Sequence, residues 1–241
     1  MQEVFDFPVS PKYGFDNFII CDGNRAAYTF ARRLADGAGT ENLLYLHGPP
    51  GSGKTHLLMA LGASLYGPDA DVRYFSFKEV DRLYQGDYPP EEVSNLAAFF
   101  SEGRALLIDD IHLIPDNKHV RSELWQVFND FYGAGRPIAI AGSLPPKELP
   151  HMDEHLVSRL LWGLVAKMDV SDDESRRMII GKLAADRHIR VPDDVVDYLI
   201  FHTRRDIPSL LHSFDTILRS SLSCKRRITL RLVRETLERE P

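Results

Sequence analysis

Gly-Pro-Pro-Gly-Ser-Gly-Lys-Thr, at residues 48 to 55, is the stretch that decides the fold of this chain. It has the form G-x-x-x-x-G-K-[ST], in which glycines let the backbone curl so that its N–H groups point at phosphate oxygens. Lys54 then meets the β- and γ-phosphates of a nucleotide, and the hydroxyl of Thr55 can ligate Mg²⁺. The pattern predicts a loop that binds the phosphates of a nucleotide together with Mg²⁺.

The flanks of this loop fit the strand and helix that such a loop requires. An apolar run precedes it at residues 43–46, and apolar residues recur at helical spacing after Thr55, at Leu57, Leu58, Leu61 and Leu65. The phosphates are therefore expected at the N-terminus of a helix, where backbone N–H groups have no partner inside the helix.

Apolar runs with the length of strands alternate with helical patterns over the first two thirds of the chain. They are residues 43–46, 72–77, 105–109, 138–141 and 164–168. This rhythm predicts an α/β fold with a five-stranded parallel sheet covered on both faces. After residue 169 the rhythm stops. We predict a leader at 1–10, a nucleotide-binding domain at 11–169 and a small α-helical lid domain at 170–241.

Four helix starts are expected in the second domain. They are a capping box at Ser171–Glu174, a start at Pro192, and caps at Asp206 and Thr229.

Composition limits the class of protein. The 241 residues are 44% hydrophobic, with a net charge of −6, and no apolar run approaches the roughly 20 residues of a membrane span. The N-terminus lacks the pattern of a signal peptide, so we expect a cytoplasmic protein without a membrane partner. Two cysteines far apart indicate neither a disulfide framework nor a zinc site. Lys225-Arg226-Arg227 is either a nucleic-acid patch or a solvated loop.

Acidic and polar residues end two of the predicted strands. Asp109 and Asp110 follow an apolar run, where a nucleotide hydrolase places one acid to hold Mg²⁺ and a second to polarise the attacking water. We assign these roles to Asp109 and Asp110 respectively. Ser143 follows residues 138–142 and is either a sensor of the γ-phosphate or a turn former.

Several short stretches resemble the AAA+ core of DnaA, the bacterial replication initiator. They are FDNFII at 15–20, NRAA at 24–27, GKTHLL at 53–58, LIDDI at 107–111, PKEL at 146–149 and SRLLWGL at 158–164. The resemblance covers about residues 5 to 238 and implies ADP or ATP as the nucleotide. It implies nucleotide contacts from Gly48, Pro50, Gly51, Ser52, Gly53, Lys54, Thr55, His56, Ile20 and Asn24.

DnaA continues into a helix-turn-helix domain, whereas this chain stops at Pro241, so we expect no sequence-specific binding of duplex DNA. In this respect the chain resembles the Hda-type regulators of DnaA, whose N-terminal peptide docks in the sliding clamp of the replicase. Their pattern, near Q-x-x-L-x-F, implies Gln2, Phe5 and Phe7 as clamp contacts. The alternative is that Phe5 and Phe7 pack on the core.

The resemblance also bears on catalysis. Arg159 matches the arginine that reaches the γ-phosphate held by a neighbouring subunit, with an internal salt bridge as the alternative role. Pro208 aligns with the sensor 2 arginine of the lid, and a proline cannot supply that charge. Arg204 or Arg205 is a candidate substitute. The loss of the arginine implies slow hydrolysis.

The implied function is regulation of replication initiation. The partners are DnaA and the sliding clamp, and Arg159 stimulates hydrolysis of ATP bound to DnaA. Two alternatives remain open: an adaptor or helicase-loader-like nucleotide switch, and a weak stand-alone ATPase that binds single-stranded DNA through its basic lid. The sequence also leaves open whether copies of the chain assemble into a homo-oligomer.

Overall fold

The computed structural model describes residues 13–66, 72–78 and 103–238. These residues form two compact units. The first, the sheet unit, contains residues 13–18, 25–48 and the described part of 53–168. The second, the helical unit, contains residues 19–24, 49–52 and 169–238.

The sheet unit is built on five parallel strands, as predicted. They are β1 (Leu43–His47), β2 (Val72–Ser76), β3 (Ala105–Asp109), β4 (Ile138–Gly142) and β5 (Leu164–Lys167), in the order β2-β3-β4-β1-β5. Tyr45 of β1 is in register with Ile140 of β4, and Leu107 of β3 with Ala139. β1 is an interior strand, between β4 and β5, and the loop at residues 48–55 follows it directly.

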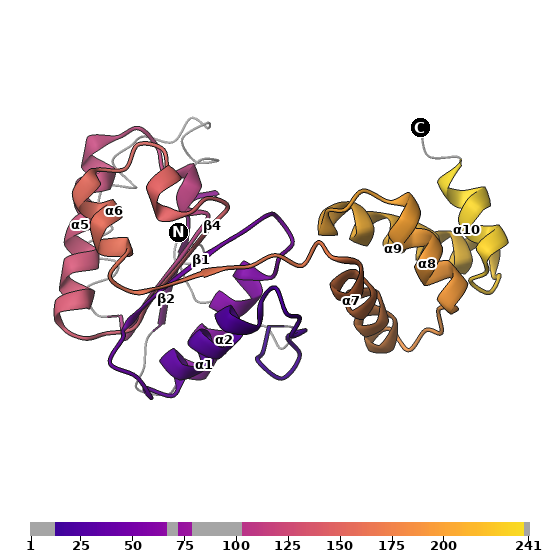
Figure 1. The fold of residues 1–241 in the computed structure, drawn as a ribbon, viewed down its shortest axis with the longest axis horizontal. Helices are drawn as coiled ribbons and strands as arrows, with labels where there is room; N and C mark the ends of the chain where they lie inside the picture. Colours follow the sequence, from indigo (N-terminus) through magenta and orange to yellow (C-terminus); the bar gives the residue numbers. More distant parts are fainter. Residues whose placement is uncertain (1–12, 67–71, 79–102, 239–241) are drawn as a thin grey trace. The chain divides into compact units, whose positions relative to one another are not determined.

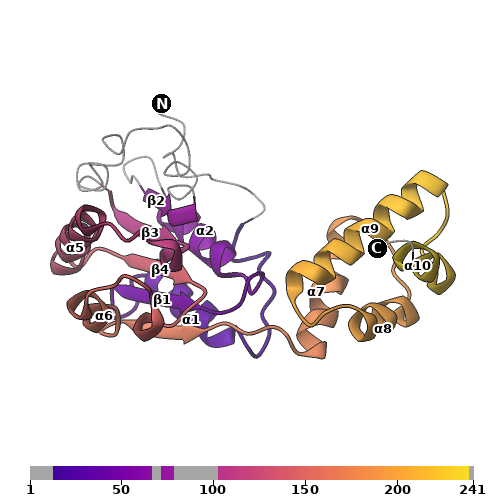
Figure 2. The same cartoon turned by 90° about the horizontal axis from the view of Figure 1, so that it is seen from above.

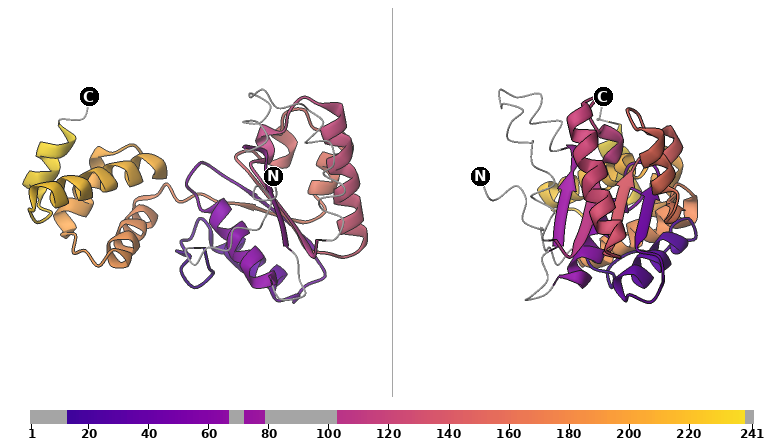
Figure 3. Two further views of the ribbon diagram at one scale, coloured as in Figure 1. Left: turned by 180° about the vertical axis from the view of Figure 1, so that it is seen from behind. Right: turned by 90° about the vertical axis from the view of Figure 1, so that its left-hand side faces the viewer.

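Helices cover both faces of the sheet (Figures 1 and 2). On one face lie α1 (Arg25–Ala35), which contacts β1 and β5, and α2 (Lys54–Leu65), which contacts β3 and β4. On the other lie α5 (Lys118–Gly133) and α6 (Glu154–Leu160). Figure 3 shows these layers from behind and from the side. Two short 3-10 helices, η2 (Ile111–Leu113) and η3 (Pro146–Glu148), follow β3 and β4.

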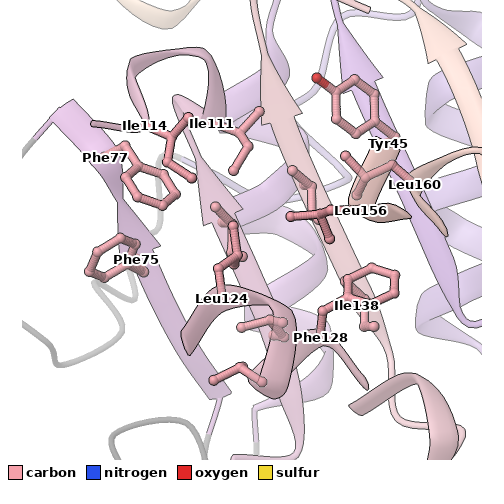
Figure 4. Packing of buried hydrophobic residues seen from close by; sticks show 14 of the residues in the cluster. Tyr45, Phe75, Phe77, Ile111, Ile114, Leu124, Phe128, Ile138, Leu156 and Leu160 are labelled. Atoms are coloured by element: carbon pink, nitrogen blue, oxygen red, sulfur yellow. The ribbon is translucent and has the colours of Figure 1, made fainter. Parts of the chain in front are cut away.

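The main core of the sheet unit lies between the sheet and α5 and α6 (Figure 4). The residues Leu124, Val127, Phe128 and Phe131 recur along one face of α5, and each is at most 4% exposed. They pack against apolar side chains of β1 to β4, among them Tyr45 and Ile138. Burial of apolar area on this scale is the main force that holds α5 on the sheet.

Four helices form the body of the helical unit, with a core of their own. They are α7 (Asp173–Asp186), α8 (Asp193–His202), α9 (Ile207–Cys224) and α10 (Leu230–Leu237). The expected caps Asp206 and Thr229 are confirmed, since they accept hydrogen bonds from the N–H groups of Ser209 and Leu232. Cys21 is buried in this core and forms no disulfide.

The expected capping box at Ser171–Glu174 is wrong by one residue. The N-cap of α7 is Asp172, whose carboxylate accepts from the N–H of Ser175 at 2.8 Å. Ser171 instead donates its hydroxyl to Asp169. Aspartate and serine are equally good N-cap residues. Because Ser171 and Asp172 are adjacent, the sequence alone does not decide which of them caps α7.

A buried arginine organises the loop between α8 and α9. Arg176 of α7 is 0% exposed, and its guanidinium donates to the backbone oxygens of Ile200 and Arg204 and to the hydroxyl of Thr203. The positive charge thus lies against carbonyls at the C-terminal end of α8, where the helix dipole is negative. Arg176 fixes the chain that leads into α9.

Candidate nucleotide-binding site

The loop at residues 48–55 has the backbone conformation that its glycines predict. Gly51 has φ 80° and Gly53 has φ 95°, in the region that L-residues with side chains rarely adopt. A Cβ on Gly53 would also lie 3.0 Å from Cε2 of Phe18. Gly53 is the N-cap of α2 and provides no side-chain cap, so the start of this helix is open to an anion.

Lys54 is buried at the start of α2. It is 9% exposed, and its ammonium donates to the carbonyl oxygen of Gly48 at 2.7 Å. Burial lowers the pKa of Lys54, while the carboxylates of Asp109 and Asp110 act in the opposite direction. The ammonium is therefore held next to the loop at a cost in solvation that a bound phosphate would offset.

Thr55 and Asp109 form a pair of oxygen groups beside this lysine. The hydroxyl of Thr55 donates to Oδ2 of Asp109 at 2.6 Å. Asp109 is 2% exposed, and burial raises the pKa of its carboxyl although the Thr55 hydrogen bond opposes the shift. A carboxylate and a hydroxyl at this distance are the hard oxygen ligands that Mg²⁺ prefers, so the two residues fit that ion.

Asp110 has a strained backbone. Its φ of 53° is in the left-handed region, which is uncommon for a residue with a side chain, and it leads directly into η2. Its carboxylate accepts from the hydroxyl of Ser76 at 3.2 Å, and Tyr74 donates to Asp109 at 3.4 Å. Tyr74 and Ser76 were not predicted from the sequence, because only the pairing of β2 with β3 brings them to the acids.

Ser143 follows β4, which lies between β1 and β3. Its backbone N–H donates to Nδ1 of His112, in η2, at 3.3 Å. Burial lowers the pKa of His112, and Asp110 and Lys54 both act on its charge. His112 therefore links the end of β4 to the acidic pair. This histidine was not predicted from the sequence, where the available signal was a polar residue two positions after Asp110.

His56 and Asn24 use their side chains within the protein. Nε2 of His56 lies 3.0 Å from both the carbonyl of Gly14 and Oδ1 of Asn17, so this nitrogen carries a proton. Asn24 belongs to the helical unit, where it accepts from the N–H of Cys21 and donates to the carbonyl of Ile19. These bonds shape the turn that contains the half-buried Ile20.

Arg159 is in the last turn of α6, with its guanidinium over the rings of Trp125 and Trp162. Pro208 is in the first turn of α9. Near it, Arg205 lies 3.8 Å from Asp173 and is mostly exposed. The residues of the expected clamp peptide, Gln2, Phe5 and Phe7, lie outside the described residues.

A parallel sheet in this order, with a glycine loop, a buried lysine and a threonine–aspartate pair at one edge, defines a P-loop nucleotide-binding fold of the AAA+ class. Comparison with known families narrows this class. The model of the bacterial DnaA ATPase domain matches residues 9–167, and the model of the Hda lid domain matches residues 173–237. The chain therefore belongs to the DnaA ATPase family, with a lid of the Hda type.

Individual relatives agree with this assignment. The replication initiator DnaA of Crocosphaera subtropica is 33% identical over 206 residues, which are 84% of this chain and 45% of that protein. Domain III of DnaA from Thermotoga maritima superposes with a TM-score of 0.84 at 28% identity, covering 97% of this chain and all of that one. The chain spans less than half the length of the curated relatives it matches.

A third relative has been solved with ligands. It is a replication initiator DnaA bound to AMPPCP and single-stranded DNA, which is 26% identical with a TM-score of 0.74. The match covers 90% of this chain and 69% of that one.

Among the helices that the structure describes here, none combines the length and apolar character needed to cross a bilayer.

Proposed function

We propose that this protein is a nucleotide-dependent regulator of DnaA that works in the cytoplasm while tethered to the sliding clamp. The observation that carries the proposal is Arg159, a half-buried arginine of the sheet unit whose side chain forms no ion pair with the described residues. An arginine without a carboxylate partner is available to a phosphate on another molecule. The match of the lid to the Hda model supports DnaA as the source of that phosphate.

The protein's own nucleotide, ADP or ATP, is held by the loop. Backbone N–H groups at Gly51, Gly53 and the start of α2 face the phosphates, and Lys54 donates to them. Pro50, which has no N–H, and Ser52 shape the turn. Thr55 and Asp109 hold Mg²⁺, which neutralises phosphate charge when it is bound. Ile20 contacts the base, and Asn24 and His56 hold the segments that present it.

Turnover of this nucleotide is slow in the proposed mechanism. Asp110 polarises water and Ser143 contacts the γ-phosphate, but Pro208 stands where the related lids carry an arginine. Arg205 lies close enough to Asp173 to be partly neutralised, which leaves Arg204 as the better substitute. A site with complete phosphate contacts and one missing charge favours binding over hydrolysis.

The active group of the regulator is Arg159, which acts on ATP bound to DnaA. An arginine supplied in trans stabilises the charge that develops on the transferred phosphoryl group, an effect worth about 10³-fold or more in rate. Gln2, Phe5 and Phe7 dock in the sliding clamp, which raises the local concentration of the regulator near DnaA.

The test is hydrolysis of ATP preloaded on DnaA, with clamp and DNA present. We expect Arg159→Ala to abolish the stimulation, while Arg177→Ala, an exposed arginine of α7, leaves it intact. We expect the double variant Gln2→Ala, Phe5→Ala to lose capture by purified clamp. Stimulation by Arg159→Ala at the level of the unaltered protein would contradict the finger assignment.

A second candidate is a nucleotide switch with no DnaA partner, and Pro208 favours it because a switch needs little hydrolysis. A stand-alone ATPase acting on single-stranded DNA has weaker support, since Arg226 and Arg231 of the basic cluster both pair with Glu235. The nucleotide that copurifies with the protein separates these readings. Rapid intrinsic hydrolysis that is lost in Asp110→Asn would favour the stand-alone ATPase.

A further inference from the structure

Arg159 lies between two tryptophans. Its guanidinium carbon is 4.7 Å from the ring centroid of Trp125, on α5, and 4.7 Å from that of Trp162, just after α6. Both distances are within the roughly 6 Å over which a cation is attracted to the face of an aromatic ring. Tryptophan is the aromatic residue that binds cations best, so this pair of contacts holds the end of a long side chain.

The tryptophans are themselves fixed to the core. Trp162 is 53% exposed, yet its ring packs on Tyr132 at 5.5 Å, and Tyr132 stacks on the fully buried Phe128 at 5.8 Å. Trp125 packs on the edge of the same core. Trp125, Phe128 and Tyr132 lie on one face of α5 because they are three and four residues apart. The two rings therefore form a rigid holder on the surface, which we call the tryptophan clamp.

Two other arginines that lie over aromatic rings have a second partner, whereas Arg234, over Tyr198, has none among the described residues. Arg32, over Phe15, pairs with Asp36, and Arg187, over Phe214, pairs with Asp215. Among the described residues the side chain of Arg159 has no hydrogen bond or ion pair. A contact with a ring uses the charge of the guanidinium, and none of its five N–H donors is taken by a hydrogen bond or ion pair with a described residue. The clamp thus orders Arg159 and leaves its donors available.

We infer that Trp125 and Trp162 are positioning residues that preset Arg159 for the γ-phosphate of ATP on the partner. This inference rests on the proposed function, since it names the residues that prepare the arginine finger. An ordered side chain loses its rotamer freedom before the partner arrives, so more of the encounters are productive. The tryptophan clamp acts on the rate of ATP hydrolysis on the partner. It has little contact area, so it has little effect on the affinity of the regulator for the partner.

The first test measures stimulated ATP hydrolysis on DnaA against the concentration of the regulator. We expect Trp162→Ala to lower the maximal rate about 10-fold, the scale on which a lost positioning contact acts, and to change the half-saturating concentration less than about twofold. Trp162→Phe keeps an aromatic face and recovers most of the rate. Leu161→Ala, a neighbouring apolar residue that is 40% exposed, is the matched control and leaves both values unchanged.

A maximal rate for Trp162→Ala equal to that of the unaltered protein would overturn the inference. So would a loss confined to the half-saturating concentration, because that result would make Trp162 a docking residue. Thermal unfolding of each variant identifies a merely structural effect. A structural role would lower the melting temperature of Trp162→Ala and Trp162→Phe with no separate change in maximal rate.

The second test needs no partner, because the only two tryptophans of the chain are those of the clamp. We expect Arg159→Met to change the intrinsic emission of the protein, whereas Arg32→Met, which removes a cation from a phenylalanine, leaves it unchanged. Identical emission from Arg159→Met and the unaltered protein would show that Arg159 does not contact the two tryptophan rings, and would overturn the inference. Failure of the unaltered protein to stimulate DnaA, with a changed emission in Arg159→Met, would overturn the proposed function alone.

Discussion

Two sites, one in each unit of the molecule, hold charged side chains in opposite ways. In the sheet unit, Lys54 and Asp109 are buried near each other. Burial lowers the pKa of Lys54 and raises the pKa of Asp109, so it favours the neutral form of each. In the helical unit, the carboxylate of Asp206 lies at the surface as a helix cap, and hydrogen bonds from Ser209 lower its pKa. The first arrangement opposes folding, and the second favours it.

The difference indicates where function constrains the fold. A protein keeps a charge in an unfavourable place when a ligand requires it there, and so perturbed groups gather at sites. Arg176 shows that burial alone does not mark a site, because its two terminal nitrogens donate to oxygens of its own unit. A buried charge indicates a binding site when its partner is a ligand, and it is structural when its partner is another group of the protein.

Replacing Arg176 gives the largest expected effect on stability. It tests whether this buried charge has a structural role, in contrast to Lys54. We expect Arg176→Met to destabilise the helical unit by about 3 kcal/mol, because it leaves carbonyls at the end of α8 without a donor. Both tryptophans are in the sheet unit, so helical circular dichroism should fall at a lower temperature than the one at which tryptophan emission changes. Arg177→Met, at an exposed ion pair, is the control and should cost less than about 1 kcal/mol. Coincident, unshifted transitions in Arg176→Met would contradict the assignment.

Replacing the lysine of the loop tests the opposite kind of buried charge. We expect Lys54→Met to weaken nucleotide binding about 100-fold, the scale of one or two charge-assisted hydrogen bonds, with no loss of stability in the absence of ligand. Titration calorimetry with ADP and thermal unfolding measure the two quantities. Lys147→Met, at an exposed position of η3, should change neither. A variant that unfolds more easily and still binds ADP tightly would make Lys54 a structural residue.

The smallest effect concerns pH. The folded pKa of Asp109 is raised, so its ionised form opposes folding above that pKa, and the opposition disappears as pH falls through it. We expect Asp109→Asn to be more stable than the unaltered protein at neutral pH, with the difference shrinking in acid. Denaturant unfolding from pH 8 to pH 4 measures this, followed by tryptophan emission.

Asp206→Asn is the control of opposite sign. The folded pKa of Asp206 is lowered, so its stabilisation is present above the pKa of the unfolded chain and is lost as pH falls through the folded pKa. Circular dichroism should therefore show that Asp206→Asn removes part of the acid sensitivity of the helical unit. The same pH dependence in both variants would mean that the two units do not differ in the way described.

The sequence predicted what depends on neighbouring residues. Strands at five apolar runs, the loop at Gly48, the acids after β3 and the caps Asp206 and Thr229 are local patterns, and the structure has the elements they predict. The order of the strands is not local, and neither is any contact that depends on it. Tyr74 and Ser76 reach the acids only because β2 pairs with β3, and the tryptophan clamp joins two helices. The cap of α7 was misplaced where several capping residues adjoin.

The interior place of β1, between β4 and β5, also has a consequence for how the chain is made. Both neighbours of β1 come late in the sequence, since β4 begins at Ile138 and β5 at Leu164. At a synthesis rate of about 5 to 20 residues per second, the apolar strand that carries the loop waits roughly 5 to 20 seconds for its first partner. During that interval its edges are exposed to other chains. In the nascent protein Leu43–His47 is therefore an apolar strand with unpaired edges until the ribosome has passed β4.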